Sequence, residues 1–118
     1  MPIHIDMLSL VGYESEDRDM VPAKNLNAQK RAMMSGLHSL RRTTNVDFGF
    51  DAAAWRDFLI ESGNEFGYTH PFAYRAVDKA VQNALENPDV QNALAILEVG
   101  RNAASENHKL GDHTLSLY

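Results

Sequence analysis

The chain has 118 residues, 44% of them apolar, which suits one globular domain built around a single hydrophobic core. It contains no cysteine, so disulfides, thiolate metal sites and cysteine nucleophiles are excluded, and no apolar run reaches the roughly twenty residues that a membrane helix needs. The first residues lack the basic segment of a signal peptide, and we therefore expect a soluble, cytoplasmic protein.

The net charge of −5 argues against bulk binding of nucleic acid, but this charge is unevenly distributed along the chain. Residues 1–22 carry a net charge of −4, residues 23–42 carry +5 and residues 43–118 carry −6. An acidic segment at 14–19 therefore directly precedes a strongly basic one.

The two ends of the chain show the alternation that is typical of extended strands. Residues 3–10 place two isoleucines and a methionine on one side of such a strand, and residues 114–118 place two leucines on one side. This alternation would allow the two segments to pair as a short β-ribbon, which would have to lie on the helices because an isolated ribbon is only marginally stable in water. Between the first strand and the first helix, residues 12–20 are mostly charged or polar and predict a solvated loop.

Four helices are predicted, near residues 23–42, 52–62, 71–86 and 88–104. Each has a start signal that a helix favours, because capping side chains accept from free backbone N–H groups and proline fits the first turn. These signals are Pro22, the N-cap Asp51, and the pairs His70-Pro71 and Asn87-Pro88.

Helices of this length, joined by short turns, predict an all-α or mainly α fold, specifically a small four-helix bundle-like domain. We expect one domain over residues 1–118, with residues 1–22 as a strand and loop and residues 105–118 as a partly mobile tail. Inside the first helix, Gly36 favours close packing of another helix, because its missing side chain leaves room for a neighbouring backbone.

The only tryptophan, Trp55, is predicted to lie in the core. It shares one face of the second helix with Phe58 and Leu59, at the i, i+3 and i+4 spacing of a buried stripe. Gly63 then ends this helix, because glycine adopts the left-handed conformation of a C-terminal cap without strain.

Residues 40–59 combine a helix end, an aromatic-glycine-aromatic turn, an acidic cap and the tryptophan helix. This segment, with Leu40-Arg41-Arg42-Thr43-Thr44, Asp47-Phe48-Gly49-Phe50-Asp51 and Ala54-Trp55, resembles the closing segment of bacterial HEAT-type helical repeat proteins. The chain has Thr44 where that pattern usually has glycine. The resemblance implies α-helical packing and brings no catalytic residues with it.

The predicted binding residues are Lys24, Arg31, His38 and Arg42, which recur at intervals of seven, seven and four along the helix at 23–42. Such a row on one side of a helix suits an acidic protein surface or phosphates, although it also fits an ordinary solvated face. We expect a small non-catalytic protein-interaction or adaptor domain, in which the acidic segment 14–19 competes with a partner for this row.

Two other classes of function remain open. A nucleic-acid-associated regulator would use the same basic face, but the row is short and no paired recognition helix is apparent. A small enzyme or metal-binding protein is the other alternative. His108, Asp112 and His113 have side chains that suit zinc or nickel, yet their spacing matches no established motif. We therefore predict no catalytic residues, no metal ligands and no cofactor, and an enzyme would require a concave site lined by titratable groups with shifted pKa values.

Overall fold

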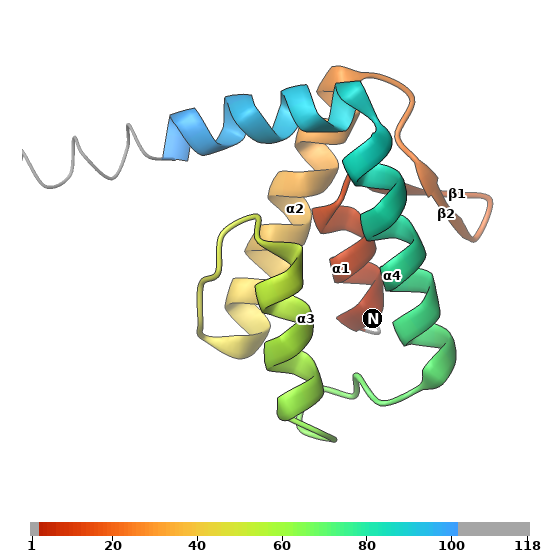
Figure 1. Ribbon diagram of the computed structural model, residues 1–118, viewed down its shortest axis with the longest axis vertical. Coiled ribbons are helices and arrows are strands. Elements are labelled where there is room, and N and C mark those ends of the chain that lie inside the picture. The colour runs from red at the N-terminus through yellow and green to blue at the C-terminus, as the bar shows by residue number, and fades with distance from the viewer. Residues whose placement is uncertain (1–2, 102–118) are drawn as a thin grey trace, which may run out of the picture.

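The computed structural model describes residues 3–101 and shows a mainly helical domain with one β-hairpin (Figure 1). The described part contains five helices: α1 (Ile3–Leu10), α2 (Leu26–Thr44), α3 (Ala52–Glu61), α4 (Pro71–Glu86) and a helix that begins at residue 88 and is described to residue 101. The strands are β1 (Tyr13–Glu16) and β2 (Asp19–Pro22). The mainly α prediction is confirmed, whereas the predicted tail at 105–118 lies outside the described residues.

Helix α1 lies against α2, α4 and α3, with the other elements arranged around it (Figure 1). The predicted strand at 3–10 is therefore wrong. The apolar residues of this short segment fit a strand, but Ile3, Met7 and Leu10 are also spaced as one helical face, and all three are buried. A helix satisfies its own backbone N–H and C=O groups, so it can be buried among other helices where an unpaired strand cannot.

Helices α1 and α2 pack tightly against each other at Gly36. A methyl group placed on this residue would lie 2.5 Å from the backbone nitrogen of Leu10 and 2.7 Å from the carbonyl oxygen of Asp6. The predicted close packing at Gly36 is confirmed, and its partner is the backbone of α1.

The segment between α1 and α2 is a hairpin rather than a solvated loop. Strands β1 and β2 pair antiparallel, with Tyr13 opposite Pro22 and Glu16 opposite Asp19. The two turn residues between them have left-handed φ angles of 47° and 73°, which is the geometry of a type I′ turn. The predictions of a loop at 12–20 and of a ribbon that includes residues 3–10 are both wrong, and residues 114–118 lie outside the described part of the chain.

Helix α2 begins three residues later than predicted. Pro22 is the last residue of β2 and does not open the helix. The N-cap is Asn25, whose side chain accepts a hydrogen bond from the backbone N–H of Ala28 at 2.9 Å.

The other predicted helix starts are confirmed. The side chain of Asp51 accepts from the N–H of Ala54 at 3.0 Å, and Nδ1 of His70 accepts from the N–H of Phe72 at 3.1 Å. Asn87 accepts from the N–H of the second residue of the last helix at 3.0 Å. Helix α4 has the predicted bounds and α3 ends one residue earlier than expected, whereas residues 102–104 of the last predicted helix lie outside the described residues.

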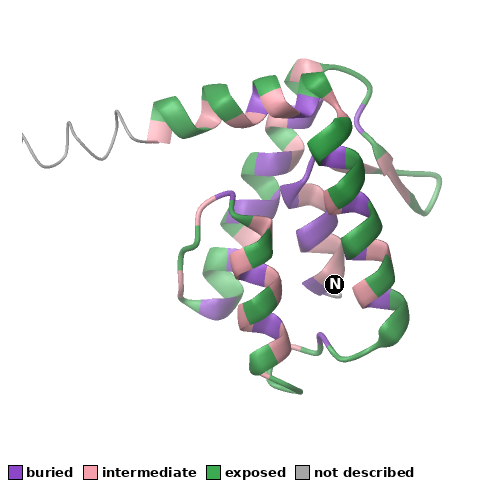
Figure 2. Ribbon diagram, in the orientation of Figure 1, coloured by how far each residue is buried: buried purple, intermediate pink, exposed green. Residues whose placement is uncertain are grey.

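Trp55 is fully buried, as predicted, and Figure 2 shows buried segments of α3 alternating with exposed ones. Its indole Nε1–H donates to the carbonyl oxygen of Gly49 at 2.8 Å. The ring of Phe48 stands edge-on to the indole, with the ring centres 5.0 Å apart. The loop before α3 thus folds back over the helix that it introduces.

Candidate functional site

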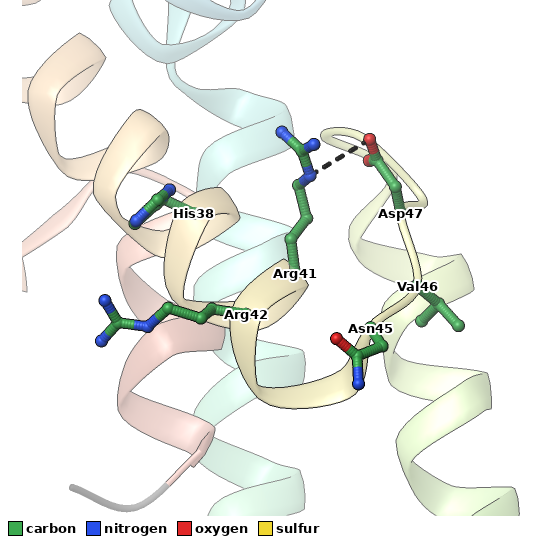
Figure 3. A pocket seen from close by; sticks show the side chains of 6 residues that line it. All are labelled: His38, Arg41, Arg42, Asn45, Val46 and Asp47. Atoms are coloured by element: carbon green, nitrogen blue, oxygen red, sulfur yellow. Dashed lines mark ion pairs between the residues drawn. The ribbon is translucent and has the colours of Figure 1, made fainter.

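The C-terminal end of α2 and the loop that follows it surround an open depression of about 610 Å³, shown in Figure 3 and called here the basic depression. Its lining residues come from the last two turns of α2 and from the next three positions: His38, Arg41, Arg42, Asn45, Val46 and Asp47. Asn45 ends α2 in the left-handed conformation, with φ of 61°, and its N–H donates to the carbonyl oxygen of Arg41 at 2.8 Å. This turn brings the loop back beside the helix and so forms the depression.

The basic row predicted from the sequence is only partly brought together. His38 and Arg42 are exposed, project from the same side of α2 and line the basic depression (Figure 3). Arg31 is exposed nearer the N-terminus of α2 and does not line the depression. Lys24 precedes the N-cap and is therefore not on the helix at all. Its Nζ lies 3.9 Å from a carboxylate oxygen of Glu16 in the hairpin.

Three further charged residues belong to the site, and the predicted row contained none of them: Arg41 and Asp47 line the depression, and Arg101 contacts Asp47. The carboxylate of Asp47 lies between two arginines: its Oδ2 is 3.3 Å from Nε of Arg41 and 2.7 Å from Nη2 of Arg101 (Figure 3 shows the first pair). Its Oδ1 accepts from the N–H of Gly49 at 2.8 Å, which fixes the carboxylate within the loop. Asp47 follows the basic run closely in sequence, but no local signal places Arg101 beside it.

The charge balance of the site favours anions. Arg41, Arg42 and Arg101 contribute three positive charges, and Asp47, which contacts two of these arginines, offsets one charge. The Arg41 and Asp47 side chains are 53% and 33% exposed, so each ion pair contributes at most about 1 kcal/mol and an incoming carboxylate can compete with it. The site can therefore bind an anionic group through charge-assisted hydrogen bonds.

The titratable groups with shifted pKa values lie elsewhere. Burial lowers the pKa of His4 and raises that of Asp6, both on α1. Burial also raises the pKa of Tyr68 to about 12, and a hydrogen bond to Asp78 raises the pKa of Arg56. None of these shifted groups lines the basic depression, so the depression itself offers no shifted acid or base to the enzyme alternative.

No metal site is visible in the part of the chain that the structure describes, since residues 3–101 contain no group of three or more histidine, aspartate or glutamate side chains placed to hold an ion. The candidate ligands His108, Asp112 and His113 lie outside these residues. Every helix within the same range is too short or too polar to cross a membrane.

Comparisons with protein-family models, with curated proteins and with solved structures gave no match for this chain. The resemblance of residues 40–59 to HEAT-type repeat proteins therefore stays a prediction.

Proposed function

We propose that this small helical, bundle-like domain is a non-catalytic protein-interaction module that binds an acidic segment of a partner protein through the basic depression. The observation that carries this proposal is that His38, Arg41 and Arg42 all line one open depression, whose lining contains a single carboxylate (Figure 3). Because the depression is open, a segment of another protein has access to it without rearrangement of the helices.

The size and charge of the site favour a protein partner over nucleic acid. Binding along a nucleic-acid backbone usually depends on many phosphate contacts, whereas the basic depression offers only a few cations in a chain of net charge −5. A short run of glutamate or aspartate side chains matches the depression better, because each carboxylate accepts two hydrogen bonds from an arginine.

The internal competitor for this site is Asp47 rather than the acidic segment 14–19. Within residues 3–101, the only ion pair from that segment to the predicted basic row joins Glu16 to Lys24, and both side chains are largely exposed. Asp47, in contrast, lies in the depression and contacts two arginines. A partner carboxylate should therefore bind most tightly where it replaces or extends the contacts that Asp47 makes with the arginines.

Charge reversal on α2 tests the proposal. The probe is a fluorescein-labelled hexaglutamate peptide, measured by fluorescence anisotropy at low salt. Replacing both His38→Glu and Arg42→Glu should weaken binding about tenfold or more, because two favourable contacts become repulsive. The matched control, Arg75→Glu with Lys79→Glu on the exposed surface of α4, should change affinity by no more than about twofold.

Three outcomes contradict this assignment. Equal losses in the two charge-reversed proteins would mean that net charge, and not the basic depression, attracts the peptide. Undetectable binding of hexaglutamate to the unmodified protein would exclude an acidic ligand for this site. Tighter binding of a single-stranded oligonucleotide at physiological salt would favour the nucleic-acid alternative.

A further inference from the structure

A second groove lies on a different part of the molecule, between the hairpin, α1 and the first turns of α4. Its volume is about 570 Å³, and its lining includes Ile5 and Leu8 of α1, Met20 and Val21 of β2, and Phe72 and Ala76 of α4. Phe72 is 62% exposed, which is unusual for so large an apolar side chain and leaves an apolar wall open to solvent. We call this the hairpin groove.

The free edge of β2 borders the hairpin groove. Residues of β2 line it and residues of β1 do not, so the groove lies on the side of β2 that faces away from β1. In the described structure the sheet has only these two strands, and this edge of β2 has no neighbouring strand. Backbone groups at an open edge are available to a further strand.

The hydrogen-bond pattern shows which backbone groups are available. The N–H of Ala23 donates to the carbonyl oxygen of Gly12 at 2.9 Å, and the strand register then makes residues 14 with 21 and 16 with 19 the other bonded pairs. Met20 lies between two bonded positions, so its N–H and C=O point away from β1, toward the groove. Pro22, the next residue with this orientation, has no N–H to donate.

We propose that the hairpin groove binds an extended, basic segment of another protein, which adds to the edge of β2 as a third strand. The backbone of that segment pairs with the N–H and C=O of Met20. Its alternate side chains contact Phe72 and Ile5, because successive side chains of a strand point to opposite faces. This proposal is independent of the basic depression.

Charge identifies the occupant. Arg18 and Asp19 line the groove itself, and Glu14, Glu16 and Asp17 on the same hairpin bring residues 13–22 to a net charge of −3, so a segment with lysine or arginine between apolar residues is complementary. A second copy of this chain is disfavoured, because pairing two β2 edges would bring two acidic hairpins together. A helix is also disfavoured, since its backbone groups are already paired and cannot bond to Met20.

A proline substitution tests the edge directly. Met20→Pro removes the outward N–H without removing a bond between β1 and β2, and edge strands accept proline at such positions. The matched control is Ser15→Pro, which removes the equivalent outward N–H from β1, and Met20→Ala removes the side chain alone. The probe is a fluorescein-labelled peptide of sequence Lys-Val-Lys-Val-Lys-Val.

The peptide should bind the unmodified protein, and Met20→Pro should weaken this binding about tenfold while Ser15→Pro leaves it within about twofold, because only β2 borders the groove. Met20→Ala should retain most of the affinity. In amide hydrogen exchange, the N–H of Met20 should become protected when the peptide is added.

Several results would overturn the proposal: no binding of the peptide, equal losses for Met20→Pro and Ser15→Pro, or equal binding of Glu-Val-Glu-Val-Glu-Val. Unchanged binding of a peptide N-methylated at alternate residues would also exclude strand addition. The protein with His38→Glu and Arg42→Glu should bind this basic peptide normally. Failure of the basic depression as a site would therefore leave the test of the hairpin groove intact.

Discussion

The α1–α2 crossing and the packing of α3 are stabilised in opposite ways. At the crossing, the backbone of α1 lies against Gly36, where even one added carbon would meet backbone atoms at 2.5 Å. Helix α3 is held by large rings: Trp55 is fully buried, and the ring of Phe48 packs against both its indole and the ring of Phe58. The first region therefore has no room for added atoms, and the second depends on atoms that cannot be removed.

The largest effect is expected from removing the indole of α3. Trp55→Ala should lower the free energy of unfolding by about 3–5 kcal/mol, because it removes a buried ring and leaves the carbonyl of Gly49 without its donor. Urea unfolding followed by far-UV circular dichroism measures this loss. Trp55→Phe should cost clearly less, and a melting temperature for Trp55→Ala within about 2 °C of the parent would contradict the importance of this ring.

The converse experiment adds one carbon at the crossing. Gly36→Ala should destabilise the protein by roughly 3 kcal/mol, because the close contact with backbone outweighs the better helix propensity of alanine. The matched control is Gly100→Ala in the helix that begins at residue 88, where an added Cβ meets nothing within 4 Å. This control should be stabilising by about 1 kcal/mol. Similar effects of the two substitutions would remove the contrast between the regions.

The helix starts of α3 and α4 were predictable from the sequence because they depend on contacts between residues close in the chain. Asp51 and His70 each cap a helix through a backbone N–H two or three residues away. Helix α1 depends instead on burial against three other helices, which an apolar segment of eight residues does not reveal. The hairpin was missed because its turn residues, Asp17 and Arg18, include none of the glycine or asparagine that usually marks a type I′ turn.

The same distinction between local and long-range contacts explains which residues of the candidate site were predicted. His38 and Arg42 were predicted because their spacing along one helix is a local property. The position of Lys24 was wrong because the helix start was placed too early, at Pro22 rather than at Asn25. The bridge from Asp47 to Arg101 joins residues 54 positions apart, and neither composition nor periodicity encodes such a contact.

A smaller effect should follow from removing the cap of α3. In Asp51→Ala the N–H of Ala54 loses its side-chain acceptor, and the free energy of unfolding should fall by about 1 kcal/mol. Asp51→Asn keeps an acceptor oxygen and should recover most of this loss. Thermal unfolding monitored by circular dichroism distinguishes the two, and equal melting temperatures for Asp51→Ala and the parent would show that the cap is not stabilising.

The smallest effect at neutral pH is expected from removing the hydroxyl oxygen of Tyr68, which lies between α3 and α4 in the chain. The side chain of Tyr68 is fully buried, and its hydroxyl has no hydrogen-bond partner among residues 3–101. Tyr68→Phe removes this unpaired group while keeping the ring, so stability at pH 7 should be unchanged or slightly higher. In this region, removal of a packed ring should thus destabilise the protein, whereas removal of an unpaired polar atom should not.

The same substitution should have a larger effect at alkaline pH. Burial raises the pKa of Tyr68 to about 12, whereas an unfolded tyrosine ionises near its ordinary value of about 10. Between these values the unfolded chain releases the proton and the folded protein keeps it, so this residue's contribution to stability is complete below the unfolded pKa and is lost as pH rises through the folded pKa. Urea unfolding at pH 7 and at about pH 10.5 should therefore show that Tyr68→Phe loses less stability on going to high pH than the parent does. A parallel loss in both proteins would mean that Tyr68 ionises at its ordinary pKa and that its hydroxyl reaches solvent.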